Sequence, residues 1–70
     1  MTEERIVELA LEVVTEALPN LESTNQSYFY GIAKILTDTI INDYALDALG
    51  SEEHVKELMK LDLERLQNSL

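Results

Sequence analysis

Several residue types are scarce in this chain of 70 residues, and each absence excludes a class of protein. The chain has no cysteine, so no disulfide stabilises it. With no cysteine and one histidine, a structural zinc site is excluded, because such sites are built from several thiolates and imidazoles. The core of a domain this small is marginal on its own. Oligomerisation or very good helix packing remains as the means of stabilisation.

Positive charge is also scarce, with 5 lysines and arginines against 14 acids and a net charge of −9. Such a surface repels nucleic acid and anionic lipid, which bind proteins through Lys and Arg. We therefore expect neither nucleic acid nor a membrane as a partner. A partner that is attracted electrostatically should be a basic protein. The plainer interpretation is that the acidity keeps a small protein soluble.

Long apolar runs are missing too, and none approaches membrane-spanning length. The opening residues, MTEERIVELALEVV, carry acids where a signal peptide carries basic residues. Together with the lack of cysteine, this predicts a cytoplasmic protein. The sequence contains no glycine-rich phosphate loop, no Ser/His/Asp set and no thiol nucleophile. We expect no enzymatic activity and no cofactor.

What is present is helical periodicity. The spacing of the apolar residues predicts an all-α fold, a three-helix bundle with a long middle helix in a single domain over 1–70. The helices are expected at about 3–18, 24–49 and 52–67. Pro19 forbids continuation of the first helix.

Polar residues with capping character mark the ends of these helices. Thr2 and Ser51 are expected to be the N-caps of the first and third helices. Ser23, followed three residues later by Gln26, has the form of a capping box for the second. Gly50 is expected in the left-handed conformation just after the second helix.

Two features predict a homodimer, either intertwined or packed side by side. The apolar arc of the first helix is roughly 200° wide, where a surface helix needs about 100°. A straight helix over 24–49 would be about 39 Å long, more than the roughly 28 Å diameter of a compact 70-residue domain. The alternative is a monomeric bundle whose middle helix is kinked, at Gly31 or near 42–43. The predicted dimer interface comprises Val7, Leu11, Val14, Leu18, Tyr28, Phe29 and Tyr30.

Acidic residues near the end of the middle helix form the candidate binding site. Asp43 and Asp47 are four residues apart and would share one helix face. With Asn42 they offer oxygen ligands suited to Mg²⁺, as in all-α nucleotide pyrophosphohydrolases and isoprenoid enzymes, which add further acidic motifs that this chain lacks. The simpler interpretation is an exposed acidic patch of Asp38, Asp43 and Asp47 for a partner protein.

Asp62 is the one acid that falls inside an apolar arc, between Leu58 and Leu66. Because an unpaired buried carboxylate is costly, this position predicts a buried ion pair with Arg65. Pairing with Arg5, a helix N-terminus, or a place at the rim of a subunit interface are the alternatives.

These observations support three hypotheses of function. The leading one is a small acidic helical protein-binding module, a regulator or inhibitor that docks on a basic surface of another protein. The second is a structural or housekeeping homo-oligomer without enzymatic activity. The third is a Mg-dependent hydrolase of phosphate esters. The first two require only surface properties, whereas the third requires a metal site.

Overall fold

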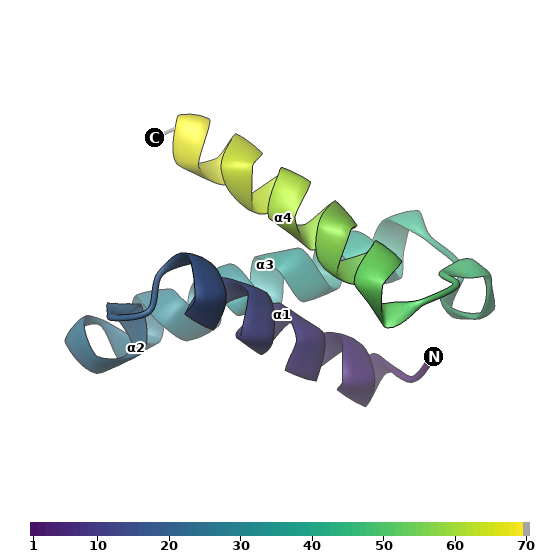
Figure 1. The fold of residues 1–70 in the computed structure, drawn as a ribbon, viewed down its shortest axis with the longest axis horizontal. Coiled ribbons are helices and arrows are strands. Elements are labelled where there is room, and N and C mark those ends of the chain that lie inside the picture. The colour runs from purple at the N-terminus through teal and green to yellow at the C-terminus, as the bar shows by residue number, and fades with distance from the viewer. Residues whose placement is uncertain (70) are drawn as a thin grey trace.

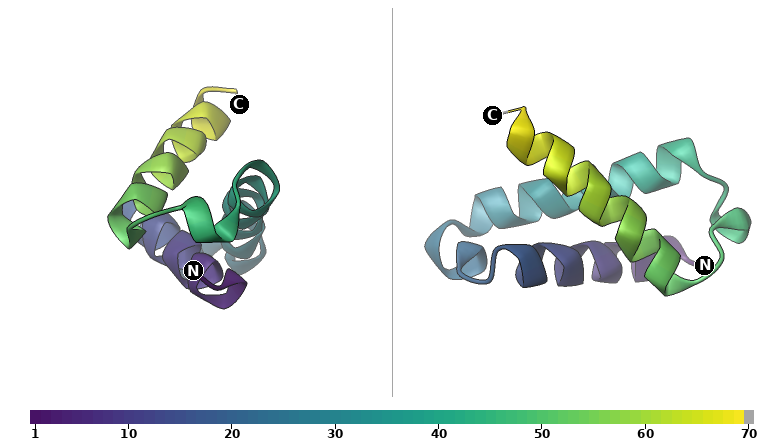
Figure 2. Two further views of the ribbon diagram at one scale, coloured as in Figure 1. Left: turned by 90° about the vertical axis from the view of Figure 1, so that its right-hand side faces the viewer. Right: turned by 45° about the horizontal axis from the view of Figure 1, so that its top comes forward.

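The computed structural model describes residues 1–69, and all regular structure in this range is helical, as predicted (Figure 1). The helices α1 (Glu3–Ala17) and α3 (Gln26–Asp43) lie side by side and antiparallel. The last helix, α4, crosses both obliquely (Figures 1 and 2). None of the helices in residues 1–69 is both long and apolar enough to cross a membrane. The elements are α1 (Glu3–Ala17), α2 (Leu21–Thr24), α3 (Gln26–Asp43), the 3₁₀ turn η1 (Leu46–Ala48) and α4 (Glu52–Asn68).

The N-termini of α1 and α4 follow local rules that the sequence makes visible. The Thr2 hydroxyl accepts a hydrogen bond from the Arg5 N–H at 3.1 Å, and Ser51 accepts one from the His54 N–H at 3.2 Å. Acidic residues occupy the first turn of both helices, where they interact favourably with the helix dipole. The caps predicted at Thr2 and Ser51 are confirmed.

The start of α3 differs from the prediction. Asn25, rather than Ser23, is its N-cap, and the Asn25 Oδ1 atom accepts the Tyr28 N–H at 3.1 Å. Ser23 lies within the short helix α2, where its hydroxyl donates to the carbonyl of Asn20 at 3.0 Å. A tertiary contact explains the difference, because the extra helical turn of α2 lets Leu21 pack against the core while the chain reverses direction.

Replacing Asn25 by alanine should therefore lower the free energy of unfolding by about 1 kcal/mol, the usual loss for a removed N-cap. Ser23→Ala should stay within about 0.5 kcal/mol, because its side chain is exposed and caps nothing. Urea titrations of both variants measure the difference. Equal losses, or a larger loss for Ser23→Ala, would show that Asn25 is not the effective cap.

The middle helix is shorter than predicted, and the expected end at residue 49 is wrong. α3 stops at Asp43, and Tyr44 is extended, with φ −133° and ψ 146°. The chain then folds back so that Leu49, 2% exposed, reaches the core, with Leu46 packed beside it. Ending at Asp43 leaves α3 about 27 Å long, which fits within the 35 Å longest dimension of the molecule. Gly50 adopts the predicted left-handed conformation, with φ 76°.

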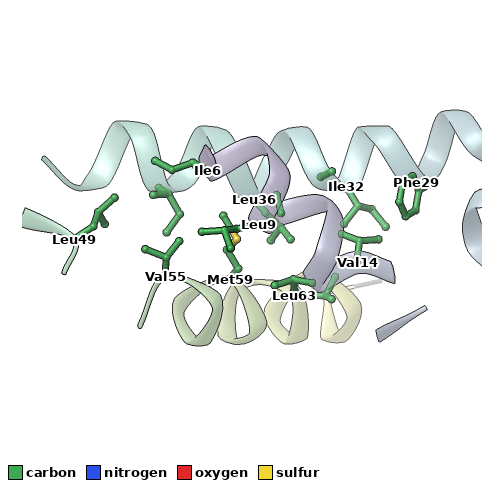
Figure 3. Packing of buried hydrophobic residues seen from close by; sticks show 14 residues of the cluster. Ile6, Leu9, Val14, Phe29, Ile32, Leu36, Leu49, Val55, Met59 and Leu63 are labelled. Atoms are coloured by element: carbon green, nitrogen blue, oxygen red, sulfur yellow. The ribbon is translucent and has the colours of Figure 1, made fainter. Parts of the chain in front are cut away.

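The core lies where α1, α3 and α4 meet (Figure 3). α1 packs against α3 on one side and α4 on the other, so most of its wide apolar arc is covered within one chain, while Val7 stays 42% exposed. The breadth of that arc therefore does not by itself require a second subunit. The buried apolar residues are Ile6, Leu9, Ala10, Val13, Val14, Phe29, Ile32, Ala33, Leu36, Ile40, Leu49, Val55, Met59 and Leu63.

Candidate functional site

The three acids of the predicted patch are all exposed, but they are arranged differently from the prediction. Because α3 ends at Asp43 and Asp47 lies in η1, the two residues do not share a helix face. Asp38 lies further back on α3, and its carboxylate accepts a hydrogen bond from Lys34 Nζ at 2.9 Å. The charge of Asp38 is therefore partly neutralised, while Asp43 and Asp47 occupy a different region at the end of the molecule.

Several acidic segments converge on that end. The start of α1, the end of α3, η1 and the start of α4 lie together on the right-hand side of Figure 1, which faces the viewer in the left panel of Figure 2. The N-terminal ammonium of Met1 donates to the Leu46 carbonyl at 3.4 Å, which joins the start of the chain to η1. We call this region the acidic end, and it comprises Glu3, Glu4, Asp43, Asp47, Glu52 and Glu53.

Arg5 provides positive charge beside the acidic end. Its guanidinium binds Glu52 in a bidentate manner, with Nε to Oε2 at 2.6 Å and Nη2 to Oε1 at 2.7 Å. The carboxylates of Glu8 and Glu12 lie 3.7 and 3.6 Å from the same guanidinium. The hydrogen bonds from Arg5 hold the pKa of Glu52 below its ordinary value of 4.5, and Glu52 raises the pKa of Arg5 in return. One cation is thus shared by three acids, and the surroundings stay negative.

A second ion pair joins the same two helices. Lys56 Nζ lies 3.2 Å from Glu16 Oε1, and the Lys56 side chain is 23% exposed. In residues 1–69, Arg5, Lys34 and Lys56 are the cations with an acid within 4 Å. Most of the lysines and arginines are therefore paired with acids of the same chain. Sequence reasoning missed the pairs between α1 and α4 because their partners lie 40 and 47 residues apart.

The predicted ion pair between Asp62 and Arg65 does not form. In residues 1–69 no cation lies within 4 Å of Asp62, and its Oδ2 atom is buried without a hydrogen-bond partner. Both residues line a small pocket of about 70 Å³ that Asp43 and Tyr44 also border. Arg65 is exposed, so its guanidinium can keep its hydration instead of following the carboxylate inward.

The predicted dimer interface is divided by the fold. Val14 and Phe29 are 0% and 2% exposed within a single chain, so they are core residues and were assigned wrongly. Val14 is buried because α4 crosses over the second apolar face of α1, and Phe29 is buried on the face of α3 that packs into the same core. Leu11 and Leu18 are half-buried against the same core.

The exposed members of that interface, Val7, Tyr28 and Tyr30, lie in two different grooves. A groove of about 390 Å³ separates α1 from α3, and Val7 and Tyr30 line it together with the charged side chains of Glu3, Lys34 and Asp38. A groove of about 340 Å³ separates α3 from α4, and Tyr28 lines it. The other residues of this second groove are Ser27, Gly31, Ile32, Ile35, Leu63, Leu66, Gln67 and Ser69.

The acids do not assemble into a metal centre in the part of the chain that the structure describes. In residues 1–69 there is no group of three or more His, Asp or Glu side chains that could hold a metal ion. Comparison of the chain with models of known protein families, with curated proteins and with solved structures finds no match. The functional interpretation therefore depends on the chemistry of the surface.

Proposed function

We propose that this chain is a small acidic protein-binding module, a regulator or inhibitor that docks through its acidic end on a basic surface of another protein. The observation that carries the proposal is the convergence of the start of α1 and the stretch 43–53, distant from it in sequence, on one strongly negative end of the molecule. Fields of one sign accelerate association with a partner of the opposite sign and orient it during approach.

The electrostatic character of the acidic end supports this role. Two helix N-termini contribute first-turn acids, and the end of α3 adds Asp43 at the negative pole of its dipole. Arg5 is already bound by Glu52, so it does not offset the remaining acids. A basic protein surface would find several unpaired carboxylates here, each hydrated and free to form ion pairs.

We also propose that the module acts as a homodimer in the cytoplasm. Exposed apolar side chains in both grooves, including Val7, Tyr28, Tyr30 and Ile35, support self-association, because apolar side chains gathered along a groove are typical of an interaction site. The lack of cysteine is consistent with a reducing compartment.

The test of the acidic end compares two variants that each lose two negative charges. Asp43→Asn with Asp47→Asn alters the acidic end, whereas Glu22→Gln with Glu64→Gln alters exposed acids elsewhere. Both variants should keep their free energy of unfolding within about 0.5 kcal/mol, as surface substitutions do. Each protein is immobilised and exposed to a cell extract at low salt, and calorimetry then measures the affinity of any captured protein.

We expect a basic protein to bind the wild type and the Glu22/Glu64 control, and to bind the Asp43/Asp47 variant at least about tenfold more weakly. The affinity of the basic protein for the wild type should fall steeply when the salt concentration is raised to a physiological level, since screening weakens exposed charge pairs. Equal binding to both variants, or capture that does not depend on salt, would contradict a role for the acidic end.

A further inference from the structure

The groove between α3 and α4 arises because α4 crosses the other helices at an angle. The C-terminal half of α4 diverges from the N-terminal half of α3 (Figures 1 and 2). The walls that this leaves open are mostly apolar, and Tyr28 and Ile35 on the rim are 45% and 46% exposed. Among residues 1–69, none of those that line the groove has a charged side chain. The groove holds about 340 Å³. A charged side chain buried against such walls would lose its hydration without a partner, so the groove disfavours a charged surface.

Charge is distributed very unevenly between this face and the rest of the molecule. Residues 26–37 contain one charged side chain, Lys34, and in residues 58–69 Lys60 and Arg65 balance Asp62 and Glu64. The two segments that build the groove therefore carry a net charge of +1, and because the whole chain carries −9, the remainder carries −10. The acidic end lies in the opposite half of the molecule (Figure 1).

Gly31 leaves additional space in the groove. The helix continues through this residue, and a Cβ atom placed on it would meet no heavy atom within 4 Å. The glycine therefore does not serve a close helix contact within the chain. Its backbone instead borders the open space of the groove.

We propose that this groove is the contact of the homodimer, with the C-terminal half of α4 from a second copy lying against α3 and α4 in a two-fold arrangement. The inference rests on the homodimer proposed above and assigns its face. A basic partner is attracted to the acidic end, whereas two copies that each carry −9 repel least when they meet through their neutral sides. A two-fold axis through the groove keeps the two acidic ends apart and leaves both free to bind.

Sedimentation equilibrium at micromolar concentration tests the proposal with a matched pair of variants. Ile35→Glu places a carboxylate in the α3–α4 groove, and Val7→Glu places one in the α1–α3 groove at a position of similar exposure, 46% against 42%. We expect the wild type and Val7→Glu at twice the 8.0 kDa mass of one chain. Ile35→Glu should weaken the dimer at least about 100-fold and sediment as a monomer, because the contact would bury an unpaired charge.

Each other outcome overturns a defined part of the proposal. A monomeric wild type would reject the homodimer itself, and with it this face. A dimer that Val7→Glu dissociates, or that Ile35→Glu leaves intact, would keep the homodimer and reject the α3–α4 groove as its contact. Binding of basic proteins to the acidic end is measured separately and is unaffected by either result.

Gly31→Leu provides a second test that does not introduce charge. A Cβ atom at this position meets no heavy atom within 4 Å and the adjoining groove holds about 340 Å³, so the variant should fold, as circular dichroism can verify. By filling the groove it should weaken the dimer at least about tenfold, while Gly31→Ala should leave the dimer intact. Raising the salt concentration should strengthen the dimer by screening the acids of the two copies, the opposite of its effect on a basic partner. Weakening by salt, or a Gly31→Leu dimer as tight as the wild type, would reject the groove.

Discussion

Replacing Met59 by alanine is expected to lower the free energy of unfolding by about 2–5 kcal/mol, the range for large-to-small substitutions in a core. Met59 is 0% exposed and lies at the centre of the core, where side chains of all three long helices surround it (Figure 3). Deleting its thioether removes contacts to α1 and α3 together and leaves a cavity. Because a domain of this size rarely has more than about 5 kcal/mol in total, much of the variant should be unfolded.

Leu61→Ala is the matched control for this experiment, because Leu61 lies on the same helix but is 54% exposed. The free energy of unfolding of Leu61→Ala should fall by less than about 1 kcal/mol, since little of the Leu61 side chain is removed from water on folding. Urea titrations followed by circular dichroism measure both values. Similar losses in the two variants would show that Met59 does not lie at a shared centre of packing.

The parts of the fold that are predictable from the sequence are those set by neighbours along the chain. The start of α1 at Glu3 and of α4 at Glu52 depends on Thr2 and Ser51, whose hydroxyls cap the following turn. Pro19 likewise ends the first helix by local geometry. Such signals act over three or four residues, so no knowledge of the tertiary fold is needed to read them.

The end of α3 depends instead on a contact between distant segments. Residues 44–49 have helical spacing of apolar side chains, and the helix could continue on propensity alone. Breaking it at Asp43 lets Leu49 become buried at 2% exposure against the core, which a straight helix would not permit. The burial of one large apolar side chain is worth about 1.5–3 kcal/mol, which exceeds the propensity of a few residues.

The same distinction applies to the candidate site. Asp43 and Asp47 are identifiable from the sequence as exposed acids close to Glu52, but Glu3 and Glu4 join them only because the fold brings the start of α1 to the 44–51 connection. The ion pair between Arg5 and Glu52 joins residues 47 apart, and no local pattern signals it. The acids in the first turns of α1 and α4 have a structural reason to be there, and the fold gathers them into one surface.

The separation of charge from apolar surface connects the two proposals. If the acidic end bound a basic protein and also formed the dimer contact, each function would obstruct the other. The neutral groove between α3 and α4 lies in the other half of the molecule, so dimerisation would leave two acidic ends available. A bivalent module binds a partner with repeated basic sites more tightly than one copy does, provided that the spacing allows both contacts.

Asp62→Leu is expected to raise the free energy of unfolding by about 1–3 kcal/mol, the cost of a buried polar group without a hydrogen-bond partner. The Oδ2 atom of Asp62 is buried and unpartnered, and Leu58, Met59 and other residues of the same pocket offer apolar contacts to a leucine. Asp43 and Arg65 border this pocket as well, with opposite charges, so the expected gain rests on the unpartnered Oδ2 atom and not on the charges around it.

Two controls separate this effect from a general benefit of reducing the negative charge. Glu57→Leu removes the same charge from an exposed position of α4 and should change stability by no more than about 0.5 kcal/mol. Arg65→Ala should change the free energy of unfolding equally little, because Arg65 is exposed and lies more than 4 Å from the Asp62 carboxylate in residues 1–69. If a buried ion pair existed after all, removing either partner would instead cost about 3–5 kcal/mol. Urea titrations that find Asp62→Leu less stable than the wild type, with a matching loss in Arg65→Ala, would restore the ion pair that the sequence predicted.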